Sequence, residues 1–110
     1  MDALTDFLQV TTTLDSQEQA QKLAQTLVER RLAACVQVLG PIDSTYFWQS
    51  KLEQSQEWLC LAKTTQLKFA ALEEAILEMH PYDVPEILAT PIVAGNKGYL
   101  DWIRQELESS

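Results

Sequence analysis

The sequence predicts an α+β fold in which an antiparallel sheet carries helices on one face. Three observations lead to this class. Short runs of apolar and β-branched residues are bounded by turn residues, which is typical of strands. Two longer segments repeat apolar residues at helical spacing. No linker or low-complexity stretch divides the 110 residues, so we expect a single domain over residues 1–110.

The first strand is expected at residues 6–13, where F-L-Q-V-T-T-T is rich in β-branched residues. Asp15 or Ser16 then caps a helix, and an acidic or amide side chain three residues later can complete a capping box. This helix is predicted to end near residues 31–34. Its apolar stripe consists of Ala20, Leu23, Ala24, Leu27 and Val28.

A long antiparallel hairpin is expected next. Its first strand begins near Ala34, is bent or broken by a glycine–proline pair, and resumes over residues 44–52. The polar run E-Q-S-Q-E at residues 53–57 is predicted to form the turn, and the return strand covers residues 57–65.

Both faces of this hairpin hold apolar side chains, because successive strand residues point to opposite faces. In its outer part we assign Tyr46, Trp48 and Leu52 to one side, and Phe47, Gln49, Lys51 and Glu53 to the other. On the return strand, Trp58, Cys60 and Ala62 oppose Leu59, Leu61 and Lys63. A sheet with helices on one side only would expose the second apolar face, so we predict self-association.

The second half repeats the pattern. Thr64 or Thr65 caps a helix that stops before Pro81, because a residue that precedes proline disfavours the helical region. A stiff loop spans residues 80–86, a strand covers residues 86–94, and a short helix covers residues 99–107. The internal Pro91 of that strand indicates a sheet edge or a bulge.

The resulting order, β-α-β-β-α-β with a tail helix, is the split pattern of ferredoxin-like folds. A net charge of -8, from 16 acidic and 8 basic residues, argues against a nucleic-acid surface. No apolar run is long enough to span a membrane, and no signal peptide is visible, so we expect a cytoplasmic protein. Cys35 and Cys60 stand in apolar segments and are expected to be reduced core residues.

Enzyme motifs are missing from the sequence. A cysteine nucleophile would need a base beside it, and His80 is the only histidine. With three glycines in the whole chain, no glycine-rich phosphate loop can form. We therefore expect a protein that is not an enzyme.

Five motifs follow one another along the chain: R-L-A-A-C-V, Y-F-W-Q-S-K-L-E, K-T-T, H-P-Y-D-V-P-E and Y-L-D-W-I. In these motifs and in their order, from about Phe7 to Leu107, the chain closely resembles the CutA divalent-cation-tolerance family. The resemblance implies a homotrimer of ferredoxin-like subunits, a build similar to the PII signalling proteins, and an association with tolerance of divalent cations, copper above all. It implies no established reaction.

Two positions depart from the family pattern. Ser50 stands where the second motif usually has glycine, which puts the local backbone geometry in question. Thr11 stands where some copper-binding members carry a cysteine near the end of the first strand. A hydroxyl is a far poorer ligand for soft metals than a thiolate, so any copper site of that kind is weakened.

The family resemblance makes His80 and Glu86 the first choice for a metal site, with Asp83 as a further oxygen donor. No cofactor is required, and Cu²⁺ or another divalent cation is expected to bind weakly, since the set is incomplete without ligands from neighbouring subunits. The alternative is that His80 only ends a helix and that Glu86 makes an ordinary polar contact.

A second candidate site is an intersubunit cleft with apolar walls and a few charges. Its candidate residues are Tyr46, Trp48, Lys51, Glu57, Lys63, Tyr82 and Trp102. Such a cleft would suit a PII-like protein that binds a small ligand. The alternative is that the aromatic residues are interface anchors, which oligomers use heavily.

Overall fold

Four strands and three helices follow one another in the predicted order over residues 6–108, which are the residues that the computed structural model describes. The strands are β1 (Phe7–Leu14), β2 (Cys35–Trp48), β3 (Lys51–Thr65) and β4 (Leu88–Pro91). The helices are α1 (Gln17–Glu29), α2 (Gln66–Met79) and α3 (Lys97–Glu108).

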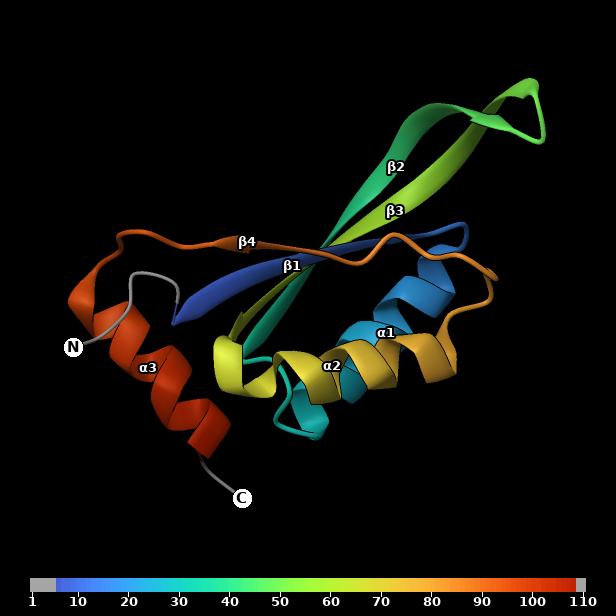
Figure 1. Cartoon of the computed structure of the whole chain (residues 1–110). Helices are drawn as coiled ribbons and strands as arrows, with labels where there is room; N and C mark the ends of the chain where they lie inside the picture. The colour runs from blue at the N-terminus through green and yellow to red at the C-terminus, as the bar shows by residue number, and fades with distance from the viewer. Residues whose placement is uncertain (1–5, 109–110) are drawn as a thin grey trace.

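The strands form one antiparallel sheet in the order β2-β3-β1-β4. Helices α1 and α2 both lie against the same face of this sheet, and α3 lies at one end of it (Figure 1). This arrangement agrees with the split pattern predicted from the sequence. β4 is an edge strand, as Pro91 indicated, although it is shorter than the predicted strand over residues 86–94.

The main core lies between the sheet and the two long helices. Its sheet side comes from alternate residues such as Val10, Cys60 and Ala62, which are 1–3% exposed. Burial raises the pKa of the Cys60 thiol to about 11, so the thiol is protonated and behaves as a small apolar group. Both cysteines are free thiols. A smaller cluster joins α3 to the end of the sheet through Ile103 and Leu107.

Local signals begin and end the helices. Ser16 caps α1, because its Oγ accepts a hydrogen bond from the backbone N–H of Gln19 at 3.2 Å. Thr65 occupies the corresponding position of α2, but its side chain makes no capping bond. Its neighbour Thr64 instead donates to the backbone carbonyl of Leu32 at 2.7 Å, which ties β3 to the segment after α1.

The predicted turn at residues 53–57 is wrong. Those residues are part of β3, and the turn consists of Gln49 and Ser50 alone, with φ angles of 51° and 67°. A two-residue connection with positive φ at both positions is the preferred tight turn of a hairpin. The polar composition of residues 53–57 suggested a loop, but the hairpin projects away from the helices, so its strand residues can be polar (Figure 1).

The new turn position also changes the faces of the hairpin. Tyr46 pairs with Glu53 and Trp48 pairs with Lys51 across the strands, while Phe47 pairs with Leu52. Directly opposed residues share a face. The assignment of Leu52 to the side of Tyr46 and Trp48 is therefore wrong, as is that of Lys51 and Glu53 to the side of Phe47.

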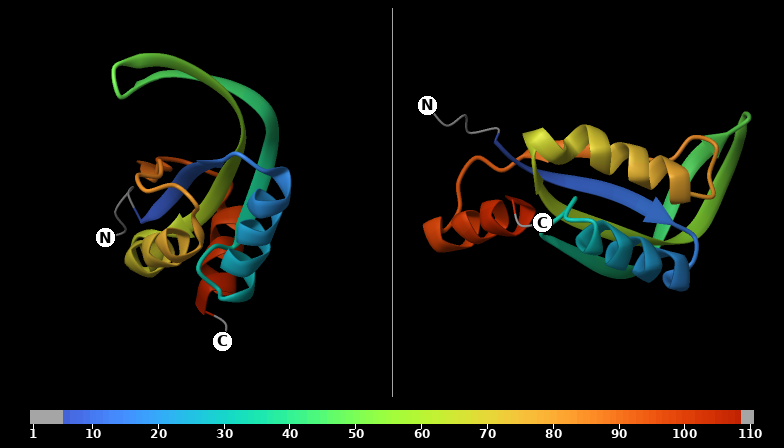
Figure 2. Two further views of the ribbon diagram at one scale, coloured as in Figure 1. Left: turned by 90° about the vertical axis from the view of Figure 1, so that its right-hand side faces the viewer. Right: turned by 90° about the horizontal axis from the view of Figure 1, so that it is seen from below.

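Gly40 and Pro41 mark a bulge, where the β2–β3 register shifts between Leu39 and Ile42. The indole of Trp58 lies across Gly40 so closely that a Cβ at this position would collide with it. A bulge bends a strand and increases its twist. Beyond this point the hairpin curls over the face of the sheet that lacks helices (Figure 2).

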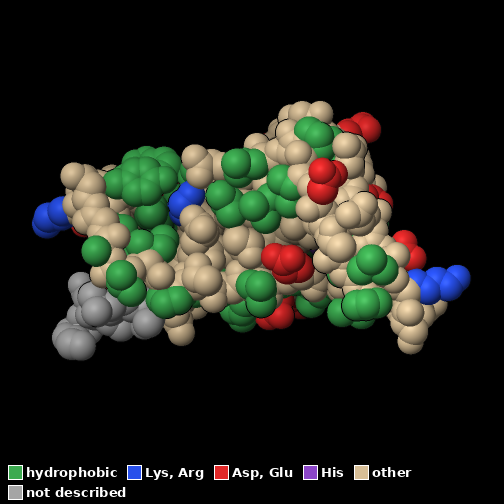
Figure 3. Space-filling model, turned by 90° about the horizontal axis from the view of Figure 1, so that it is seen from above, with side chains coloured by type: hydrophobic (Ala, Val, Ile, Leu, Met, Phe, Trp, Pro, Cys, Tyr) green, Lys and Arg blue, Asp and Glu red, His purple; other side chains and the backbone are tan. Residues whose placement is uncertain are grey.

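No helix of the described residues covers that second face (Figure 1). Hydrophobic side chains spread over it in the space-filling view from above (Figure 3). Leu39 is 47% exposed on this face. On the other face of the hairpin end, Phe47 and Leu52 are 74% and 66% exposed. The prediction that the hairpin carries apolar groups on two faces, one of them uncovered, is confirmed.

We expect Ser50→Gly to raise the free energy of unfolding by roughly 0.5–1 kcal/mol. The left-handed conformation at this position costs a residue with a Cβ about 1–2 kcal/mol. The greater conformational freedom of glycine in the unfolded chain offsets part of the gain. Urea denaturation followed by circular dichroism measures the change. Ser44→Gly, inside β2, is the control and should lower stability. Equal effects of the two changes would contradict the assigned turn.

Candidate functional site

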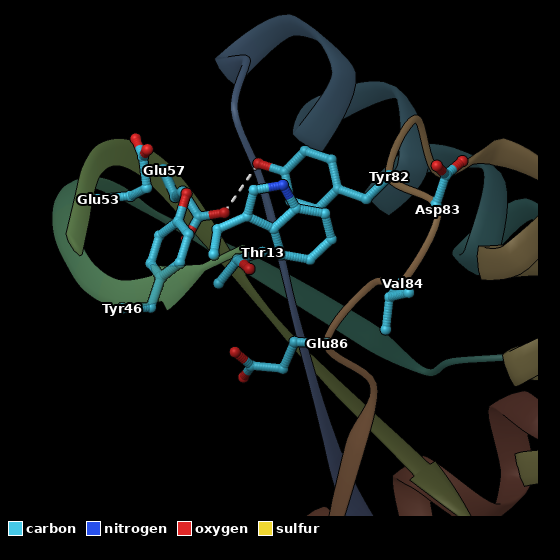
Figure 4. A pocket seen from close by; sticks show the side chains of 9 residues that line it. Thr13, Tyr46, Glu53, Glu57, Tyr82, Asp83, Val84 and Glu86 are labelled. Carbon is cyan, nitrogen blue, oxygen red and sulfur yellow. Dashed lines mark hydrogen bonds between the residues drawn. The ribbon is translucent and has the colours of Figure 1, made fainter. Parts of the chain in front are cut away.

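A hollow of about 500 Å³ opens where three segments meet. The end of β1 forms its floor at Thr13, the curled hairpin forms one wall, and the loop between α2 and β4 forms the other (Figure 4). The bulge at Gly40 positions this site, because it bends the hairpin toward the loop.

Most of the side chains that line the hollow are aromatic or acidic. Tyr46, Trp48 and Tyr82 provide aromatic walls. The four carboxylates are those of Glu53, Glu57, Asp83 and Glu86. Within the described part of the chain, no Lys, Arg or His is among the lining residues. Several like charges around one concave surface focus a negative potential, which attracts cations and repels anions.

Glu57 is the most buried of these carboxylates, with 7% of the residue exposed. The hydroxyl of Tyr82 donates a hydrogen bond of 2.8 Å to its Oε2 (Figure 4). Burial and this bond to a carboxylate raise the pKa of Tyr82, so the phenol stays protonated at neutral pH and continues to donate. Over residues 6–108, no basic side chain lies within ion-pair distance of Glu57.

His80 lies beneath the loop and is buried. Its Nε2 is 2.8 Å from the backbone oxygen of Thr13, and its Nδ1 accepts a hydrogen bond from the backbone N–H of Tyr82 at 3.2 Å. These partners assign the proton to Nε2. The ring also contacts that of Tyr82 edge-on, with centroids 4.6 Å apart. His80 thus fixes the loop to the end of β1.

Glu86 lies further along the loop and is exposed. The hydroxyl of Thr11 is 3.4 Å from its Oε2, so the position where some family members carry a cysteine lies beside this carboxylate. Among residues 6–108, no group of three or more His, Cys, Asp or Glu side chains is placed to hold a metal ion. The metal site at His80 and Glu86 stays a prediction.

The structure brings together four of the residues proposed for the small-ligand cleft, namely Tyr46, Trp48, Glu57 and Tyr82. The others do not line the hollow within one chain. Lys63 donates to Gln37 at 2.7 Å, and Trp102 stacks on Tyr99. Lys51 pairs with Trp48 beside the turn and is not a lining residue.

Sequence reasoning missed Thr13, Glu53 and Val84 as lining residues. The sequence places Glu53 in the predicted turn and on the face opposite Tyr46. Because the turn was predicted at the wrong position, Glu53 was not recognised as a neighbour of Tyr46. The alternation of β1 could have shown that Thr13 faces away from the helices. The loop residue Val84 carried no such signal, because a loop has no fixed periodicity.

Comparisons with known proteins identify this arrangement. The sequence profile of the family described as CutA1 divalent ion tolerance protein matches residues 8–106. The chain is 48% identical over 93 residues to the divalent-cation tolerance protein CutA of Thermus thermophilus, covering 84% of this chain and 90% of that protein. It is 40% identical over 97 residues to human protein CutA, covering 88% of this chain and 54% of that longer protein.

Solved structures agree with the sequence comparisons. The divalent cation tolerance protein Cut A1 from Thermus thermophilus superimposes with a TM-score of 0.89 at 46% identity, covering 91% of this chain and 97% of that one. CutA from Xylella fastidiosa gives 0.91 at 36% identity, covering 94% and 99%. The fold and the acidic hollow thus belong to a protein of the divalent-cation-tolerance class. This chain is a member of the CutA1 family, as the five motifs predicted.

The Thermus thermophilus relative is named a tolerance protein, and none of the names given above refers to an enzyme. One archaeal structure is called periplasmic, and a rice relative is called chloroplastic, so the cytoplasmic location of this chain stays a prediction. No helix over residues 6–108 combines the length and the hydrophobicity that crossing a membrane requires.

We expect Tyr82→Phe to lower the free energy of unfolding by about 1–3 kcal/mol, because it leaves the buried Glu57 carboxylate without its donor. The pKa of Tyr82 is higher in the folded state than in the unfolded state, so its stabilising contribution is complete below about pH 10 and decreases at higher pH. The free energy of unfolding of Tyr82→Phe should therefore decrease less than that of the wild type as the pH rises above 10. Urea denaturation at pH 7 and at pH 10–11 measures both effects.

The matched control is Tyr46→Phe, which removes a hydroxyl that shares a hydrogen bond of 3.1 Å with Ser55 at an exposed position. Its effect should stay below about 1 kcal/mol. If the two substitutions cost the same, burial does not strengthen the contact between Tyr82 and Glu57.

Proposed function

We propose that this chain works as a homotrimer that contributes to divalent-cation tolerance by binding cations, Cu²⁺ among them, without catalysing a reaction. The observation that carries the proposal is the hollow lined by four carboxylates and, within the described residues, by no basic side chain. The names of the relatives support the cation part of the proposal.

For a weakly held divalent cation we propose Glu86 as the primary ligand. It is exposed, and the Thr11 hydroxyl beside it could add a second oxygen. His80 would have to give up its bond to Thr13 or the one from Tyr82 before either nitrogen could bind a metal. Oxygen ligands without a thiolate favour weak binding of copper.

The trimer is supported by the uncovered apolar face of the sheet. On the side away from the helices, Leu39 of β2 pairs with Leu59 of β3, and Leu61 follows two residues later on β3. Packing such faces together removes apolar surface from water at a gain of about 25 cal/mol per Å². A short chain gains much of its stability from burial of this kind.

A PII-like role has weaker support. The relatives described above all carry a CutA name. The negative potential of the hollow would also repel phosphate ligands. We therefore do not propose nucleotide binding.

Calorimetric titration with Cu²⁺ tests the metal role. We expect weak binding by the wild type and at least fivefold weaker binding by Glu86→Gln, because the substitution removes a charged oxygen ligand. Growth at raised copper of cells that depend on this chain should fall in parallel. Glu74→Gln, on the exposed face of α2, is the control. Unchanged affinity in Glu86→Gln would remove this carboxylate from the metal site.

Light scattering tests the oligomer. The wild type should have three times the chain mass of 12.5 kDa, and Leu39→Glu should lower the mass at micromolar concentration by placing a charge in the contact. Leu67→Glu is the control, since Leu67 is 94% exposed at the start of α2 and outside the sheet. A wild-type chain that stays monomeric would refute the trimer.

A further inference from the structure

We propose that the hollow binds a small organic cation, an ammonium or guanidinium ion, and that Glu57 is the residue that recognises its charge. This inference goes beyond cation tolerance and does not depend on it. It concerns the inner part of the hollow, between Tyr46 and Tyr82, and not the exposed carboxylate of Glu86 (Figure 4).

The first argument is the burial of Glu57. A carboxyl group that is 7% exposed loses most of its hydration, and the cost of burying the charge of a carboxylate is usually offset by a buried cation. Over residues 6–108, Tyr82 is the one side chain that we find hydrogen-bonded to it, through Oε2. Its remaining lone pairs can accept donors from a ligand, and an ammonium or a guanidinium carries such donors together with the missing charge.

The second argument is the chemistry of the walls. Tyr46, Trp48 and Tyr82 come from two different segments, yet all of them line the same space as Glu57. Aromatic faces attract ammonium and guanidinium ions, and cages of several aromatic rings recognise such ions in proteins. A volume of about 500 Å³ is within the range of small-molecule sites and far larger than a single metal ion requires.

The third argument excludes the competing ligands. A divalent metal at Glu57 would need several protein ligands, and no group of three or more His, Cys, Asp or Glu side chains in the described residues is placed to supply them. A phosphate or carboxylate ligand would approach Glu53 and Glu57 against like charge. An organic cation satisfies the buried charge and uses the aromatic walls together.

A pair of isosteric probes tests the inference. Butylguanidinium and butylurea have nearly the same shape, but only the first is charged. In NMR titrations at low salt, we expect the wild type to bind butylguanidinium at least tenfold more tightly than butylurea, and to show no shift with ATP. Glu57→Gln should abolish that preference, while Glu74→Gln, on the exposed face of α2, should retain it.

Three outcomes would overturn the proposal. One is equal binding of the two probes by the wild type, and another is a preference for butylguanidinium that survives in Glu57→Gln. The third is no binding of either probe by the wild type. If Glu57→Gln also dissociates the trimer, a basic side chain of a neighbouring chain fills the hollow. None of these results bears on Glu86 and copper, so the proposed function is tested separately.

Discussion

The pairing of β2 with β3 is the constraint on which the rest of the molecule depends. Near the helices, this hairpin buries Cys60 and Ala62 in the core. Beyond the bulge at Gly40, the same two strands leave the helices and curl back over the opposite face (Figure 2). One continuous ladder therefore builds both the hydrophobic core and a wall of the acidic hollow, and a change in its register would displace both.

The elements of the fold could be predicted because their signals are local. Ser16 begins α1 and Pro81 follows the end of α2, and each acts within a few residues of its own position. The turn of the hairpin could not be placed in this way. Gln49 and Ser50 lack the Asn-Gly or Gly signal of a tight turn, whereas the polar residues that follow them look like a loop. Only the register with β2 shows that they form a strand.

The hollow was predicted less completely than the fold. Sequence reasoning selected Tyr46, Trp48, Glu57 and Tyr82 as residues of one cleft, and the structure brings them together. The basic residues named with them, Lys51 and Lys63, do not line it, since alternation along a strand and a bulge decide where a side chain points. The negative charge of the hollow could therefore be recognised only in the three-dimensional structure and not from the sequence motifs.

His80 shows how one residue type can suit both a structural role and a metal-binding role. A lone histidine beside acidic residues suggests a metal ligand, but its two nitrogens hold the backbone of Thr13 and that of Tyr82. These bonds place Tyr82 where its hydroxyl reaches Glu57. Loss of the imidazole would therefore disturb the hollow even if no metal ever touched it. A decrease in metal binding on replacement of His80 alone could thus arise from loop movement, which is why Glu86 is the informative position for the metal.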